Sequence, residues 1–199
     1  LTAADGFIWG VSGRPQFWKV DERTNEVIDI PIRWTSRDEI TGFAVGEGSI
    51  WVSTYPPLGV GQRTIRFDAQ TGAEQAIIGA GGSIAVGEGS LWTFDQRAGV
   101  LARFDAQTNS PVRSVAVRPG LRRVIVSHGM VWLLGEIDGV LTRIDPQSSR
   151  AETDIIAGEP HKRGFLGALI GGDAGFYTGA CVTDEAAFVA HHRANTGLF

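Results

Sequence analysis

The sequence contains one cysteine, Cys181, and no long apolar run. A single cysteine excludes an internal disulfide framework in any redox compartment. No stretch approaches the roughly 18 apolar residues that span a bilayer, and the first ten residues, LTAADGFIWG, lack the basic and apolar regions of a signal peptide. We therefore expect no membrane span. The compartment stays open, with a slight preference for an extracytoplasmic or secreted location.

Positive charge is also scarce. The formal net charge is -4 and the pI is about 5.6. A protein that mainly binds nucleic acid needs a basic surface to neutralise phosphates, so we expect no nucleic-acid partner. With 43% apolar residues, the chain can still bury a core of its own.

The common catalytic and cofactor motifs are missing, including G-x-S-x-G, the P-loop, H-E-x-x-H and the EF-hand loop. The glycine-rich segment Gly79–Gly82 joins two expected strands and has no helix behind it to bind a phosphate. The apolar pattern also lacks a helical period. The one possible helix, Thr183–Arg193, aligns equally well with a degenerate strand. The sequence therefore predicts an all-β chain and no cofactor.

What the chain does contain is a repeat. A turn followed by an aromatic residue recurs every 40 to 45 residues or so, which is the period of a propeller blade. The copies end at Trp9, Trp51, Trp92, Trp132 and, more weakly, Tyr177. A second anchor ends in an aspartate, at Asp21, Asp68, Asp105 and Asp145. The side chains of these aspartates and of nearby threonines can bond the backbone of the turn that follows.

Alternation of apolar and polar residues between the anchors predicts four short strands per repeat, A to D. In the third repeat they are Ile84–Val86, Ser90–Asp95, Val100–Asp105 and Pro111–Val117. The tryptophans share one phase in every repeat, as packing between blades requires, so we expect them in the core.

The segments Ile84–Trp92 and Ala102–Thr108 resemble the repeat of the YVTN/NHL and streptogramin-lyase-like β-propellers. The resemblance covers nearly the whole chain and implies a single propeller domain of four-stranded antiparallel blades. The repeats are about 1–38, 39–81, 82–121, 122–164 and 165–199, with the first and last incomplete. About five repeats fit either a five-bladed ring or part of a six- to seven-bladed ring. Incomplete terminal blades also permit self-association.

The two ends of such a blade differ. The A–B and C–D connections, at what we call the turn end, are short and uniform. The B–C and D–A connections, at what we call the loop end, vary from repeat to repeat, and variable loops on a rigid scaffold often bind ligands. The predicted ligand-binding residues therefore belong to the loop end: Arg33, Trp34, Arg37, Tyr55, Arg97, Arg118, Arg122, Arg123, His161 and Arg163.

Most of these residues have a plainer interpretation. The arginines favour binding of a carboxylate or phosphate, but they also fit a solvated rim paired with acids such as Asp38 and Glu39. Trp34 lies outside the repeat pattern and could stack on a ligand. Tyr55 belongs to the longest B–C loop, which could instead be merely rigid.

Few residues could carry catalysis. His161 is the best candidate for a general acid or base, because it lies in the longest cationic D–A loop. Glu136 and Asp138 could bind a metal or act as a general base, although carboxylates in such a turn more often serve only the turn. We interpret Cys181, just after strand B of the fifth repeat, as a buried or half-buried thiol.

The sequence thus favours a non-catalytic β-propeller binding module for a small anionic ligand or a protein partner. The resemblance implies one alternative, a C–O lyase that uses Mg²⁺ or another divalent ion. A second alternative is a structural or sensor segment of a larger protein.

Overall fold

The computed structural model describes residues 1–12, 16–34, 38–56, 61–135, 140–156, 176–182 and 187–192. All the regular elements in these ranges are β-strands, and no helix in them could cross a membrane. The predicted all-β class is confirmed.

The strands form four antiparallel sheets of four, each following chain order. Blade 1 contains β1 (Thr2–Ala4), β2 (Phe7–Val11), β3 (Phe17–Asp21) and β4 (Val27–Ile30). Blade 2 contains β5 (Glu39–Gly46), β6 (Ser49–Tyr55), β7 (Arg63–Asp68) and β8 (Glu74–Ile78). Blade 3 contains β9 (Ser83–Gly87), β10 (Ser90–Asp95), β11 (Val100–Asp105) and β12 (Pro111–Ala116). Blade 4 contains β13 (Leu121–Ser127), β14 (Met130–Gly135), β15 (Val140–Ile144) and β16 (Ala151–Ile156).

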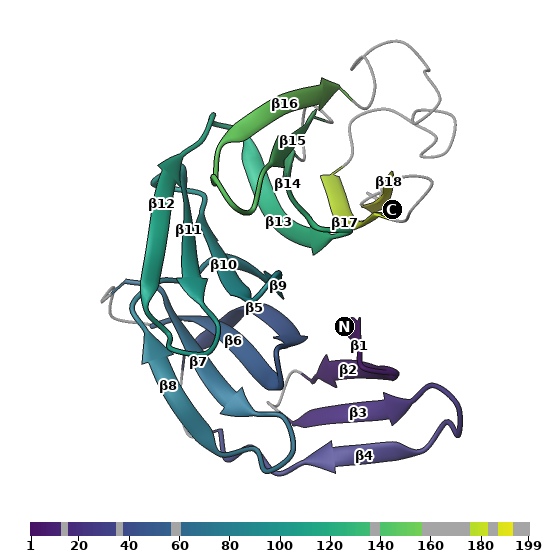
Figure 1. Cartoon of the computed structure of the whole chain (residues 1–199). Helices are drawn as coiled ribbons and strands as arrows, with labels where there is room; N and C mark the ends of the chain where they lie inside the picture. The colour runs from purple at the N-terminus through teal and green to yellow at the C-terminus, as the bar shows by residue number, and fades with distance from the viewer. Residues whose placement is uncertain are drawn as a thin grey trace, which may run out of the picture.

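The blades are arranged around a common centre, with the first strand of each blade innermost and the last outermost (Figure 1). The inner strands β1, β5, β9 and β13 contact one another in that order. The fifth repeat contributes a two-stranded sheet of β17 (Phe176–Val182) and β18 (Ala187–His192), and β17 contacts β13. This is the β-propeller that the repeats predicted.

Two-residue turns join strands A and B in all four blades. Glu47 and Gly48 have φ of 53° and 70°, and Glu88 and Gly89 have φ of 54° and 65°. Two successive positive φ angles define a type I′ turn, whose twist matches that of the strands it joins. The recurring glycine is therefore a requirement of the turn.

The core lies between the blades. On β6, Ile50 and Val52 pack toward blade 1, whereas Trp51, one residue out of phase, packs toward blade 3. This follows from the alternation of side chains along a strand. Trp9, Trp51 and Trp92 are buried, as predicted for core residues, and Trp132 is half-buried.

The glycine-rich segment Gly79–Gly82 fits tightly between blades 2 and 3. A Cβ on Gly82, whose φ is +103°, would collide with the carbonyl oxygen of Phe94, and one on Gly81 would lie 2.7 Å from Ser53 Oγ. The segment joins β8 to β9, both strands, as expected from the sequence. Close packing accounts for glycine at positions 81 and 82.

Strand predictions in the third repeat agree with the structure to within one residue. The segment that could have been a helix contains the strand β18 instead. The predicted position of Cys181, just after strand B of the fifth repeat, was wrong. Cys181 lies within β17. The strand is longer than predicted and contains a register irregularity between Tyr177 and Gly179.

Candidate functional site

The turn end is built from hydrogen bonds that repeat from blade to blade. Asp68 Oδ1 accepts hydrogen bonds from the backbone nitrogens of Gln70 and Thr71, at 3.0 and 2.7 Å, and from the Thr71 hydroxyl at 2.8 Å. Asp105 makes the same set with Gln107 and Thr108. These bonds to Thr71 lower the pKa of the Asp68 carboxyl, because they stabilise its charged form. The predicted turn chemistry is confirmed.

Arginines on strand C tie blade 2 to blade 3 and blade 3 to blade 4 at this end. Arg66 lies 4.8 Å from the Trp51 ring centroid and donates from Nε to Ser49 Oγ at 2.9 Å. Its Nη1 donates to Asn109 Oδ1 in blade 3 at 3.1 Å.

Blade 3 repeats the arrangement. Arg103 lies over Trp92, its Nε donates to Ser90 Oγ, and its Nη1 donates to the carbonyl of Pro146 in blade 4. The polar side chains of the turn end therefore serve the scaffold.

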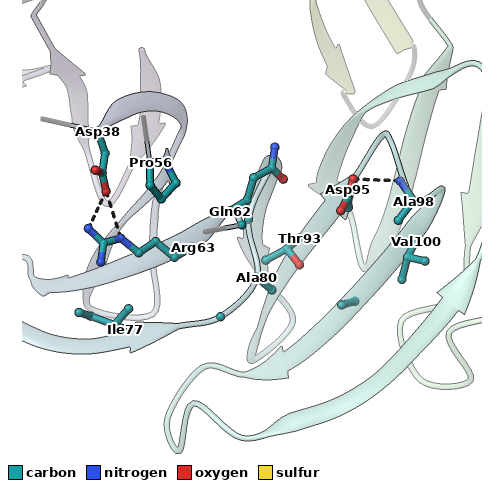
Figure 2. Close-up of a pocket in the computed structure, with 14 residues that line it drawn as sticks. Asp38, Pro56, Gln62, Arg63, Ile77, Ala80, Thr93, Asp95, Ala98 and Val100 are labelled. Carbon is teal, nitrogen blue, oxygen red and sulfur yellow. Dashed lines mark hydrogen bonds and ion pairs between the residues drawn. The ribbon is translucent and has the colours of Figure 1, made fainter. Parts of the chain in front are cut away.

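The loop end contains a large pocket among the described residues. It has a volume of about 1170 Å³ and lies between blades 2 and 3 (Figure 2). Ligand pockets commonly measure roughly 300 to 1,000 Å³, so a small organic molecule fits. The lining combines glycine, small apolar and a few polar residues: Asp38, Pro56, Gly61, Gln62, Arg63, Ile77, Gly79, Ala80, Gly81, Thr93, Asp95, Ala98, Val100 and Ala102.

An ion pair lies at the blade 2 end of this pocket. Arg63 donates to Asp38 Oδ2 from Nη2 at 2.6 Å and from Nε at 3.1 Å, and the Thr54 hydroxyl donates to the same oxygen at 3.3 Å. The Asp38 side chain is only 8% exposed, whereas that of Arg63 is 37% exposed. The buried carboxylate thus holds a guanidinium that remains accessible from the pocket.

The other polar groups come from the middle of the pocket and from blade 3. Gln62 Oε1 is buried and has no hydrogen-bond partner among the described residues. Thr93 is buried on β10. Asp95 Oδ1 accepts from the backbone nitrogens of Arg97 and Ala98, at 2.8 and 3.1 Å, so this carboxylate caps its own turn.

Two of the predicted residues meet beside the pocket. The guanidinium of Arg97 lies 5.7 Å from the ring centroid of Tyr55. Tyr55 ends β6 of blade 2, and Arg97 lies in the B–C turn of blade 3, next to the lining residues Pro56 and Ala98. This contact joins the two B–C loops across the blade junction.

The other described candidates lie apart from the pocket lining. Trp34 is half-buried, with its ring centroid 5.9 Å from that of Phe17 and 6.4 Å from that of Phe67, so it packs between blades 1 and 2. Arg33 is exposed and lines a separate recess of about 290 Å³ near the C–D turn of blade 2.

The second group of arginines belongs to the junction of blades 3 and 4. Arg122 donates to Gln96 Oε1 at 3.3 Å, and Gln96 Nε2 donates to the Arg122 carbonyl at 2.7 Å. Arg118 Nη1 donates to the carbonyl of Pro119, and Arg123 is exposed. The predicted ligand-binding arginines that the structure describes are therefore spread over three blade junctions and do not converge on one pocket.

Arg37, His161 and Arg163 lie outside the described residues, as do Glu136 and Asp138. Among the side chains that the structure describes, no group of three or more His, Cys, Asp or Glu is placed to hold a metal ion.

The pair Asp38 and Arg63 was missed as a pocket element, although Asp38 was expected to pair with a cation. The sequence did contain a signal that Arg63 is unusual. It stands three residues before Arg66, where the next two repeats have Val100 and Val140 three residues before Arg103 and Arg143. A charged residue at an apolar position of a repeat marks a local departure from the scaffold pattern.

The fold and this interblade pocket define a β-propeller with a candidate binding site at its loop end. No protein-family model matches the chain, and no curated protein matches it by sequence. The likeness to solved structures is one of fold.

BamB from Moraxella catarrhalis has a TM-score of 0.61 and 14% identity, covering 92% of this chain and 57% of that chain. U3-55K has a TM-score of 0.57 and 11% identity, covering 76% and 48%. Glutaminyl cyclase from Myxococcus xanthus has a TM-score of 0.54 and 11% identity, covering 89% and 82%. The chain thus spans about half the length of the first two proteins.

Proposed function

We propose that this protein is a non-catalytic β-propeller binding module that holds a small organic ligand in the pocket between blades 2 and 3. The observation that carries the proposal is the pocket itself, which lies at the loop end, is large enough for a ligand and joins apolar walls to a fixed guanidinium.

The polar groups of the pocket favour binding over chemistry. Asp38 is paired with Arg63, and Asp95 caps its own turn. No histidine or cysteine is among the lining residues that the structure describes. A general base or nucleophile needs a side chain that can reach a substrate, and these carboxylates are already committed to Arg63 and to the turn.

The pocket also bears on the kind of ligand. One positive side chain, Arg63, and two negative ones, Asp38 and Asp95, line the pocket, and the positive Arg97 lies beside it. This is close to neutral and does not form a broad cationic funnel. A mainly apolar molecule with one polar group fits this lining better than a multiply charged anion. Membership among the YVTN/NHL and streptogramin-lyase-like propellers remains part of the proposal, supported by the repeat.

A fragment screen by ligand-observed NMR tests the binding role. Val100 lines the pocket and is half-buried, so Val100→Trp fills part of the cavity, and we expect it to abolish binding of the hits. Val112→Trp is the matched control, because Val112 lies on the outer strand of the same blade and is 52% exposed.

Hits that bind the Val100→Trp protein as tightly as the unmodified protein would refute this site. Equal losses in both variants would also count against it, since Val112 is not a lining residue.

A further inference from the structure

Resting on the proposed function, the hydrogen-bond pattern of Arg63 allows the ligand to be defined further. A guanidinium carries five N–H donors in a rigid plane. Asp38 uses the edge formed by Nε and Nη2. The adjacent edge, formed by Nη1 and the second N–H of Nη2, makes no hydrogen bond to the described part of the chain. That edge has the spacing that a carboxylate binds with two parallel hydrogen bonds.

Asp38 fixes this edge in position. Its carboxylate is nearly buried and also accepts from Thr54 on β6, so it holds Arg63 from the blade 2 side. Figure 2 shows both dashed contacts on one side of the guanidinium, with the remaining terminal nitrogen turned away from Asp38. An arginine held in this way loses little conformational entropy when it binds a ligand.

Much of the pocket lining beyond Arg63 is apolar. Ile77 lies at the same end of the pocket as Arg63, and Ala80 and Val100 continue the lining toward blade 3 (Figure 2). The other carboxylate, Asp95, lies at the far side on blade 3 and is occupied by its own turn. The pocket therefore offers one site for an acidic head group and an apolar space for the remainder of the molecule.

We propose that the ligand is a small monocarboxylic acid with an apolar body, and that its carboxylate binds the free edge of Arg63. A carboxylate in this position binds the edge next to the one that Asp38 uses, so each of the two anions contacts the cation along its own edge. A phosphate-bearing ligand fits less well, because its second negative charge has no partner among the described lining residues.

The test is a pair of probes that differ only in the head group, hexanoate and hexanamide, titrated into the protein and followed by protein NMR. Charge-assisted hydrogen bonds are stronger than neutral ones, so we expect hexanoate to bind about tenfold more tightly or better. Arg63→Lys should remove most of this preference, because an ammonium keeps a charge near Asp38 but cannot present two parallel donors.

Arg113→Lys is the matched control, since Arg113 is exposed on the outer strand β12 and should keep the preference. Val100→Trp should abolish binding of both probes if they occupy this pocket.

The outcomes separate the two proposals. Equal affinity for hexanoate and hexanamide in the unmodified protein would overturn the carboxylate assignment but would not contradict the proposed binding function. This comparison requires no variant, so it does not depend on whether a variant folds. A preference that survives Arg63→Lys would also overturn it. If neither probe binds while other screened molecules bind and lose affinity in Val100→Trp, only the carboxylate assignment fails. If no molecule binds in this pocket at all, the proposed function fails with it.

Discussion

Two isoleucines at equivalent positions test how the blades are held together. Ile8 and Ile50 each precede the repeating tryptophan on strand B. Ile50 is 0% exposed in the core between blades 1 and 2, whereas Ile8 is 41% exposed. The Ile8 side chain lies on the face of blade 1 that points away from blade 2. The same substitution at both positions therefore measures what a neighbouring blade contributes.

Ile50→Ala removes buried methyl and methylene groups and leaves a cavity, which typically costs about 2 to 5 kcal/mol. Ile8→Ala removes groups that already contact solvent, so we expect about 1 kcal/mol. In a chain of this length each kcal/mol shifts Tm by roughly 2 to 4 °C. Ile50→Ala should then lower Tm by about 6 to 12 °C if its cost is near 3 kcal/mol, and Ile8→Ala by only a few degrees.

Differential scanning calorimetry suits this comparison, because it also shows whether a repeat protein unfolds in one transition. Comparable losses of Tm in the two variants would refute the reasoning, since they would mean that the outer face of blade 1 is covered in solution.

Three further predictions address the scaffold. Hydrogen bonds from Thr108 lower the pKa of the Asp105 carboxyl, so they stabilise the fold above the unfolded-state pKa of about 3.9 and less as pH falls through the folded-state value. Asp105→Asn should therefore lower Tm more at pH 7 than near pH 2, and an equal effect at both pH values in thermal melts would contradict this. Gly82→Ala should lower Tm strongly because its φ is +103° and its Cβ has no room, whereas Gly79→Ala, with nothing within 4 Å of its Cβ, should leave Tm almost unchanged. Similar melting curves for these two variants would be inconsistent with the packing of the D–A segment. Arg66→Met should cost about 1 to 3 kcal/mol in urea unfolding through its lost interblade hydrogen bonds, and an unchanged midpoint would show that these bonds contribute nothing.

The propeller was predictable from the sequence because every blade solves the same packing problem. The tryptophan anchor, the type I′ turn at Glu88 and the capped turn at Asp105 each impose a local requirement that recurs at a fixed period. Burial of Trp92 follows from that period alone. Strands within a blade could be placed in the same way, since alternation of side chains is a local property.

The candidate site was less predictable because it is formed between blades. The loop end was chosen from loop variability, and the pocket between blades 2 and 3 does lie there. Most of the conspicuous loop residues that the structure describes lie apart from this pocket, as Trp34 shows by packing on Phe17. Asp38 and Arg63 stand 25 residues apart in the chain, and only the pairing of β5, β6 and β7 brings them together. No local pattern reports such a contact.

The central claim is that a ligand binds between blades 2 and 3 at the loop end, and NMR chemical-shift mapping tests it most directly. A chain of 21.3 kDa is suited to amide spectra with backbone assignments. On titration of a screening hit, the account predicts that the largest shifts cluster at Gln62, Thr93 and Val100. Shifts that cluster instead at the C–D turns around Asp68 and Asp105 would contradict the account, because they would place binding at the opposite end of the propeller.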